Sequence, residues 1–201
     1  MNTEAPAPDA TDEQDRLDMK RLTRGDEDSL NQLMERHGSR LFHYLIRQTG
    51  SEQDAADLAQ ETFVRVYQAR ERFDTKARFT TWLYTIATNL ARNRHRWKHR
   101  HPEVSIESTA QPDGPTLGET LVAQDSHPSD NLQQGERNQI IRDAVLSLPE
   151  KLREPLVLAE YQDCSMKEIS EILFCSVKAV ESRLARARQD LREKLASLWS
   201  F

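Results

Sequence analysis

The sequence predicts an all-α protein made of two small helical domains joined by a flexible linker. Apolar residues recur three and four positions apart through two long blocks, which is the spacing of one helix face. No segment alternates apolar and polar residues with β-branched enrichment, so we expect essentially no sheet. Residues 103–136 hold seven acids and no Lys or Arg, with Pro112, Pro115 and Pro128, as a linker would. We therefore expect an acidic disordered tail at 1–15, a first domain at 16–102, the linker at 103–136 and a second domain at 137–201.

The composition argues against several classes of protein. The chain has 201 residues and a net charge of −5, with no apolar stretch that could serve as a signal peptide or a membrane span. We therefore expect a cytoplasmic protein without direct membrane insertion. The two cysteines, Cys164 and Cys175, fit a reducing compartment, and we favour two buried thiols over a disulfide or redox switch. No glycine-rich phosphate loop, metal cluster or nucleophile with a base stands at suggestive spacing, so we expect no enzyme and no cofactor.

The first block divides into three predicted helices. The first carries the apolar residues between Leu30 and Ile46, and Gly50-Ser51 then breaks its pattern. The second covers about Glu52 to Arg70. After the loop ERFDTKAR, a third helix begins near Phe79 and carries the apolar residues Trp82, Leu83, Ile86, Ala87 and Leu90.

The second block opens with an apolar stripe that ends at Leu148. Pro149 then starts a new helix, PEKLREPLVLAEY, because proline is tolerated in a first helical turn. Pro155 lies inside this segment and should kink the helix or reset its start, since proline has no backbone N–H to donate.

A short helix, a tight turn and a longer helix follow, which is the pattern of a helix-turn-helix. Ser165 and Glu168 form a capping box, Phe174-Cys175 makes the turn, and Ser176 can cap the last helix. That helix should turn inward Val177, Val180, Leu184 and Leu191. The alternative is a plain helical bundle with a basic exposed face.

The strongest functional signal is a stretch from Thr75 to Pro102 that contains no acid. Its basic residues are Lys76, Arg78, Arg92, Arg94, Arg96, Lys98 and Arg100. Interleaved in or beside it are Phe73, Phe79, Trp82, Tyr84 and Trp97. Basic groups neutralise phosphates and aromatic rings stack on unpaired bases, so the pattern favours an opened nucleic-acid strand. The alternative is a solvated basic face over a core that includes Phe79 and Trp82, and for Trp82 itself we favour the core.

Two further features are weaker. His95 and His99 are spaced as a metal-binding pair on a helix would be, but their neighbours are cationic and supply no Cys or carboxylate. We therefore expect no metal site. The segment from Asp57 to Phe63 places carboxylates beside an apolar face, and it is either an ordinary amphipathic helix or a docking surface for a partner.

Three segments, in this order, resemble the extracytoplasmic-function (group IV) class of the sigma-70 family of RNA polymerase sigma factors. DLAQETFVRVYQ resembles the region 2.2 helix that docks on the clamp coiled coil of the polymerase. RFDTKARFTTWLYTIATNLARNRHR resembles regions 2.3 and 2.4, which melt and read the −10 element. LPEKLREPLVLAEYQDCSMKEISEILFCSVKAVESRLARAR resembles region 4, whose helix-turn-helix reads the −35 element. The short acidic linker, where other classes carry region 3, agrees with this class.

The resemblance implies a sigma factor that binds the clamp coiled coil and the flap of core RNA polymerase. It would direct promoter-specific initiation, in a stress or envelope response, on DNA that is duplex at −35 and single-stranded at −10. An anti-sigma factor would regulate it. The linker would be either a nucleic-acid mimic in the polymerase channel or a simple spacer. The acidic total charge should weaken DNA binding by the free chain, so that promoter recognition requires polymerase.

The resemblance also assigns candidate residues to each contact. Polymerase would be contacted by Asp57, Leu58, Gln60, Glu61 and Phe63. The −10 element would be contacted by Phe73, Lys76, Arg78, Phe79, Trp82, Tyr84, Asn89, Arg92, Asn93 and Arg96, with Phe73 in a loop that captures a flipped base and Asn89 nearby. The −35 element would be contacted by Ser176, Lys178, Ala179, Glu181, Ser182, Arg183, Arg186 and Arg188.

Two residues depart from the family pattern. Phe174 stands where the helix-turn-helix turn usually holds glycine, so the turn is expected to be strained or rebuilt. Glu181 stands where many relatives carry a basic residue, and it can accept a hydrogen bond from cytosine but repels phosphate. Two rival functions also stay open: a stand-alone helix-turn-helix regulator that binds its operator without polymerase, and an interaction protein that sequesters a regulator.

Overall fold

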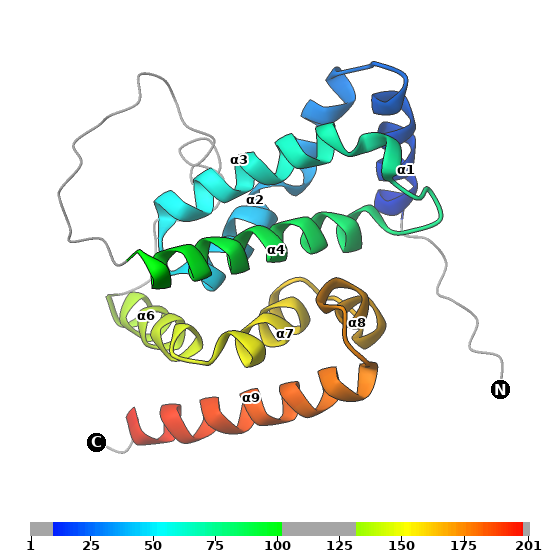
Figure 1. Ribbon diagram of the computed structural model, residues 1–201. Coiled ribbons are helices and arrows are strands. Elements are labelled where there is room, and N and C mark those ends of the chain that lie inside the picture. Colours follow the sequence, from blue (N-terminus) through cyan, green and yellow to red (C-terminus); the bar gives the residue numbers. More distant parts are fainter. Residues whose placement is uncertain (1–9, 102–131, 199–201) are drawn as a thin grey trace.

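A computed structural model describes residues 10–101 and 132–198, and this part of the chain contains helices and no strand, as predicted. The first half consists of α1 (Ala10–Thr23), α2 (Asp28–Thr49), α3 (Glu52–Gln68), the 3-10 turn η1 (Arg70–Arg72) and α4 (Phe79–Arg100). The second half consists of α6 (Leu132–Leu146), α7 (Glu150–Tyr161), α8 (Met166–Leu173) and α9 (Val177–Leu198). In Figure 1, α3 and α4 lie above α7 and α8, and α9 lies below them.

Several helix ends follow from local sequence. Gly50 ends α2 in the left-handed conformation (φ 73°), and its N–H donates to the Ile46 carbonyl at 2.8 Å. Ser51 then caps α3 by accepting a hydrogen bond from the Asp54 N–H at 3.2 Å. The break predicted at Gly50-Ser51 is therefore confirmed.

The structure contains an N-terminal helix, α1, that the sequence analysis did not predict as a separate helix. The predicted tail ended at Asp15, whereas α1 begins at Ala10, so residues 10–15 are helical. Its inward face carries carboxylates: Asp15 and Asp18 are fully buried. Arg36 on α2 donates to both, reaching Asp18 Oδ2 at 2.8 Å, and His37 Nε2 lies 2.9 Å from Asp15 Oδ1. These ion pairs offset the cost of burying the two acids.

Two further predictions concern the start of the second half. Helix α6 begins at Leu132, within the predicted linker of residues 103–136. Residues 1–9 and 102–131, with the question of a nucleic-acid mimic, lie outside the described residues, as do Trp199 and Phe201. Pro155 does not restart its helix, because α7 runs from Glu150 through it. Since only the single N–H of residue 155 is missing, the loss is one hydrogen bond near the start of the helix.

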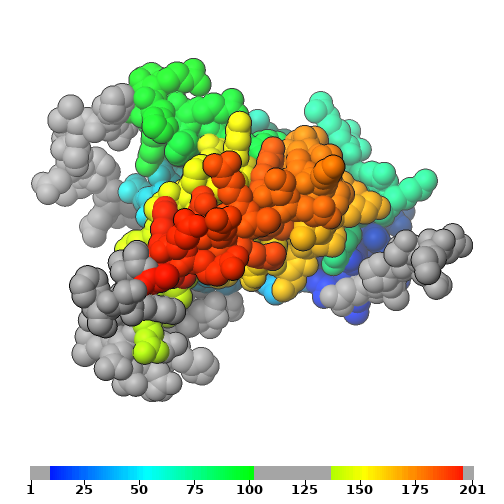
Figure 2. Space-filling model, turned by 90° about the horizontal axis from the view of Figure 1, so that it is seen from below, coloured from blue at the N-terminus to red at the C-terminus, as the bar shows by residue number. Residues whose placement is uncertain are grey.

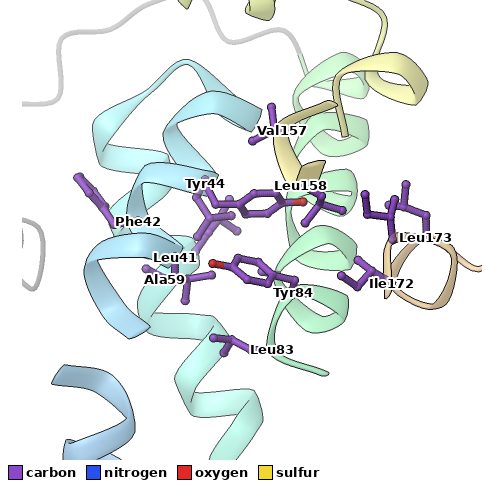
Figure 3. Close-up of a cluster of buried hydrophobic side chains, with 14 of the residues drawn as sticks. Leu41, Phe42, Tyr44, Ala59, Leu83, Tyr84, Val157, Leu158, Ile172 and Leu173 are labelled. Atoms are coloured by element: carbon purple, nitrogen blue, oxygen red, sulfur yellow. The ribbon is translucent and has the colours of Figure 1, made fainter. Parts of the chain in front are cut away.

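The two halves share one apolar core. Helix α2 packs on α6 and α7, and α4 packs on α8. Figure 3 shows Tyr44 and Tyr84 of the first half among Leu158, Ile172 and Leu173 of the second. Tyr44 is fully buried, its hydroxyl lies 2.7 Å from Thr88 Oγ1, and its ring centroid lies 5.0 Å from that of Tyr84. The structure thus holds the two predicted domains against each other.

Candidate nucleic-acid and polymerase interfaces

A groove of about 570 Å³ runs between the C-terminal part of α3 and the middle of α4. From α4 it is lined by Trp82, Ile86, Asn89, Leu90 and Asn93, which recur at helical spacing on one face. The facing wall is formed by Arg65, Gln68, Ala69 and Arg72. An indole and two amides beside guanidinium groups suit an unpaired base and its phosphates.

The aromatic residues of this region form a cluster under the groove. The Phe73 ring centroid lies 5.2 Å from that of Trp82 and 6.2 Å from that of Phe79. Phe79 is fully buried and Phe73 is 9% exposed, while Trp82 is half-buried and lines the groove. Among these three aromatic residues predicted to touch the −10 element, Trp82 is therefore the one that the groove exposes, and the other two support it. The prediction that Trp82 is a core residue is confirmed in part, because its ring packs on Phe73 but also lines the groove.

Arg65 and Arg72 are groove residues that the sequence analysis missed. Both are exposed, and Arg65 Nε donates to Glu61 Oε1 at 2.6 Å. Both precede the acid-free stretch that begins at Thr75, so they do not belong to the basic pattern of that stretch. Arg65 lies in the last turn of α3, but the position of Arg72 is set by the 3-10 turn η1 that follows, so no helical spacing in the sequence groups the two.

The opposite face of α4 contacts the second half of the chain. Arg92 Nε and Nη2 donate to the two carboxylate oxygens of Glu154 at 2.6 and 2.7 Å. Tyr84, 4% exposed, donates its hydroxyl to Gln162. The hydrogen bonds to Glu154 raise the pKa of Arg92, so its guanidinium stays charged. In this conformation Arg92 and Tyr84, both predicted to contact DNA, are occupied.

The other basic residues of the stretch have different surroundings. Arg94 Nη1 donates to Asp54 Oδ1 at 3.1 Å and Lys98 also donates to Asp54, which ties both cations to α3. Lys76 and Arg96 are exposed. The basic run is therefore partly structural and partly free for phosphate.

The histidine pair lies at the edge of the two halves. The His95 and His99 rings meet edge to face with centroids 4.7 Å apart, and His95 Nδ1 lies 3.5 Å from Glu150 Oε2. Within residues 10–101 and 132–198, no group of three or more His, Cys, Asp or Glu is arranged to hold a metal ion.

A second groove, of about 830 Å³, lies between α2 and α3. Leu30, Met34 and Phe63 contribute apolar surface, and Val64 at its edge is 46% exposed. The polar residues that line it include Glu27, Asn31, Asp57, Gln60 and Glu61. An apolar floor with a charged rim is the usual anatomy of a protein interface. Of the residues predicted to contact polymerase, Leu58 and Phe63 are 4% and 2% exposed and belong to the core that holds α3 in place, although Phe63 also lines the groove.

The helix-turn-helix forms as the sequence predicted. Ser165 accepts from the Glu168 N–H at 3.3 Å, and Glu168 accepts from the Ser165 N–H at 2.8 Å, which completes the capping box. Burial opposes ionisation of Glu168, but hydrogen bonds to its carboxylate from the Ser165 hydroxyl at 2.6 Å and the Ser165 N–H, with the charge of Arg78, lower its pKa. The turn is not rebuilt: Phe174 itself takes the left-handed conformation (φ 52°, ψ 50°) and is 73% exposed. Ser176 caps α9 by accepting from the Ala179 N–H at 3.2 Å.

Helix α9 crosses the front of the molecule in Figure 2, and most of its exposed residues are polar. Val180 and Leu184 point into the core, but Val177, predicted to do so, is 39% exposed because it occupies the first helical position beside the turn. The exposed residues among those predicted for −35 contact are Ser176, Lys178, Glu181, Ser182, Arg186 and Arg188. Ala179 and Arg183 are half-buried.

Two of the arginines on α9 have protein partners. Arg183 Nη1 donates to Cys175 Sγ at 3.5 Å. Arg188 Nη2 donates to Glu160 Oε1 at 2.7 Å, across to α7. Compared with Arg183 and Arg188, Lys178 and Arg186 are therefore the cations of this face that are more available to contact phosphate or guanine.

None of the described helices has the length and apolar character needed to cross a membrane.

The sequence matches two family models: Sigma-70 region 2 at residues 33–101 and Sigma-70, region 4 at residues 138–191. The ECF RNA polymerase sigma factor SigW of Bacillus subtilis is 34% identical over 181 residues, covering 90% of this chain and 96% of its own. The RNA polymerase sigma-H factor of Pseudomonas aeruginosa is 31% identical, covering 94% and 97%. The ECF RNA polymerase sigma-E factor of Escherichia coli is 32% identical, covering 92% and 95%.

Solved structures agree with these relatives. CnrH, solved in complex with the cytosolic domain of CnrY, is 26% identical with a TM-score of 0.68, covering 92% of this chain and 98% of its own. RpoE of Bartonella quintana, solved with the anti-sigma factor NepR, is 24% identical with a TM-score of 0.62, covering 85% and 98%, and shows the same fold. The matched regions, their order and their coverage place the chain in the sigma-70 family, among the extracytoplasmic-function RNA polymerase sigma factors.

Proposed function

We propose that this sigma factor directs promoter-specific initiation by using three separate surfaces. The α2–α3 groove docks on core polymerase, the α3–α4 groove holds the melted −10 strand, and the outer face of α9 reads the −35 duplex. The observation that carries the proposal is the α3–α4 groove, in which Trp82 lies beside Asn89 and Asn93 and faces Arg65 and Arg72. Such a site offers stacking, amide hydrogen bonds and phosphate contacts to one extruded nucleotide.

Polymerase docking at the α2–α3 groove rests on its shape and rim. Asp57, Gln60 and Glu61 border the apolar floor formed by Met34 and Phe63. Charged rims steer association, while the apolar floor supplies most of the affinity. The candidate site for the flap of the polymerase is another apolar groove, of about 780 Å³, between α6, α7 and α9. It is lined by Ile141, Val145, Leu156, Tyr161, Leu191 and Leu195.

The −35 contact rests on the exposed start of α9. Residues early in a recognition helix reach base edges, and the cations beside them reach phosphates. Lys178 and Ser182 are exposed there, and Glu181 can accept a hydrogen bond from the cytosine amino group. In this proposal the protein acts at promoters together with polymerase, in the cytoplasm, and catalyses no reaction itself. Regulation by an anti-sigma factor, in a stress or envelope response, follows from the family.

The experiment is transcription from a matching promoter by core polymerase, with and without this chain. The variant Asn89→Ala/Asn93→Ala should bind polymerase normally but open the −10 region at least about tenfold less, measured by permanganate reactivity of promoter thymines. The matched control is Gln139→Ala/Gln189→Ala, which removes two exposed amides from α6 and α9.

Two outcomes would contradict the proposal at different levels. Normal promoter opening by the Asn89/Asn93 variant would show that the α3–α4 groove does not hold the strand. No gain in promoter-specific transcription on adding the wild-type chain would refute the proposed function as a whole.

A further inference from the structure

The seam between the two halves pairs cations of the −10 face with acids of the second half. Arg92 makes its two hydrogen bonds to Glu154, which is 3% exposed. About one helical turn further along α4, His95 Nδ1 lies 3.5 Å from Glu150 Oε2. Since Glu150 and Glu154 are four residues apart on α7, they form one acidic edge that faces the basic side of α4.

The other end of the seam repeats the arrangement. Arg78 Nη1 donates to Glu168 Oε1 of α8 at 2.6 Å, and its Nε lies 2.6 Å from Asp12 Oδ2 of α1. Glu168 and Asp12 raise the pKa of Arg78 and outweigh its burial, so this guanidinium also stays charged. Between the two arginines, Tyr84 donates to Gln162 and packs into the shared apolar core (Figure 3).

At these arginines, the hydrogen bonds across the seam and contacts with DNA phosphates exclude each other. A guanidinium that spends two donors on one carboxylate cannot present the same pair to a phosphate. The Glu154 carboxylate therefore stands where phosphate oxygens would stand if Arg92 contacted a strand. At Arg78, Glu168 occupies Nη1 from across the seam while Asp12 of α1 occupies Nε. Trp82 and Asn89, on the other face of α4, stay open in the α3–α4 groove, so only part of the −10 face is covered.

Size gives an independent argument. A compact body of about 160 residues has a radius of gyration of about 15 Å and hence a diameter of roughly 40 Å. The −10 and −35 elements are about two helical turns apart, which is roughly 70 Å of duplex. With α4 and α9 held on one such body (Figure 1), the chain cannot engage both elements at once.

We infer that the acidic face of α7 and α8 is an internal stand-in for DNA, which keeps the free chain closed until polymerase separates the two halves. The inference rests on the proposed function of α4 as the −10 face. It adds that the second half of the chain, besides reading −35, competes with the −10 strand for Arg78 and Arg92.

The test compares two variants of the full chain that change charge equally. Glu154→Gln/Glu168→Gln removes both seam carboxylates while keeping their shape, and Gln at 168 still completes the capping box with Ser165. The control Glu13→Gln/Glu171→Gln removes two acids from α1 and α8 at exposed positions away from the seam. Binding of each free chain to a fluorescent single strand of −10 sequence is measured by anisotropy, and opening is measured by small-angle X-ray scattering.

The seam variant should bind the strand about tenfold more tightly than wild type and should have a larger radius of gyration, because Arg92 without its partner gains hydration by leaving the seam. The control should stay within about twofold of wild type. Circular dichroism establishes that each variant is folded, and the single variant Glu154→Gln, expected to show the same changes at smaller size, replaces the double variant if that one unfolds.

Each outcome of these measurements either supports or overturns the inference. Equal binding by the seam and control variants overturns the inference, whether or not the scattering changes. Transcription by the wild-type chain with core polymerase is measured in the same series. If it is normal while the seam variant gains nothing, the inference fails and the proposed function stands; if it is absent, the proposed function fails first.

Discussion

The strained turn of the helix-turn-helix gives a prediction whose size can be worked out. Phe174 adopts φ 52° and ψ 50°, a conformation that costs an L-residue about 1–2 kcal/mol and glycine almost nothing. Glycine gives back about 0.4–1 kcal/mol through its greater freedom in the unfolded chain. The ring is 73% exposed, so removing it forfeits only about 0.5 kcal/mol of burial.

Two substitutions separate these contributions. Phe174→Gly and Phe174→Ala lose the same ring contacts, but only glycine relieves the strain. We expect Phe174→Gly to be more stable than Phe174→Ala by about 1 kcal/mol, or roughly 2–4 °C in Tm. Against wild type, glycine should gain about 0.5 kcal/mol and alanine should lose about 0.5 kcal/mol. Urea and thermal unfolding followed by circular dichroism measure both differences, and equal stability of the two variants would refute the argument from strain.

Three other substitutions or reactions test separate parts of the structure. Burial raises the pKa of Cys164 to about 12, so its thiolate fraction at pH 8 is roughly a thousandfold below that of a free thiol; iodoacetamide labelling followed by mass spectrometry should be slow in the folded chain and fast in urea. Asp18→Ala should destabilise the chain by roughly 2 kcal/mol in urea unfolding, because Arg36 loses a buried partner, whereas Glu13→Ala on the exposed side of α1 should be nearly neutral. Glu181→Gln should relax the preference for one base of a −35 duplex by about tenfold in a binding panel, and an unchanged preference would remove Glu181 from base reading.

Local signals explain why much of the fold could be predicted. The Ser165–Glu168 capping box and the Gly50-Ser51 break each depend on residues within three or four positions, so sequence alone locates those helix ends. Helix α1 escaped because its inward face carries Asp15 and Asp18, which read as solvent-facing residues. Arg36 and His37, eighteen or more residues later, make their burial possible.

The candidate sites show the same division between local and distant information. Helical spacing groups Trp82, Asn89 and Asn93 on one face, and the structure does place them in one groove. The opposite wall, with Arg72, depends on how the 3-10 turn redirects the chain after α3, which no periodicity encodes. The partner of Arg92 lies 62 residues away, so the basic pattern of α4 cannot distinguish a cation that is free for phosphate from one that already holds a carboxylate.

The acidic net charge of −5 acquires a local meaning from this seam. A diffuse negative charge would weaken DNA binding only through screened, long-range repulsion. Glu154 and Glu168 act within hydrogen-bond distance of Arg92 and Arg78, where neither screening nor distance weakens them much. Acids at these two positions therefore affect DNA binding by the free chain more than the same number elsewhere on the surface. When polymerase holds the two halves apart, Arg92 is returned to the promoter, and Arg78 loses Glu168 but keeps Asp12 of its own half.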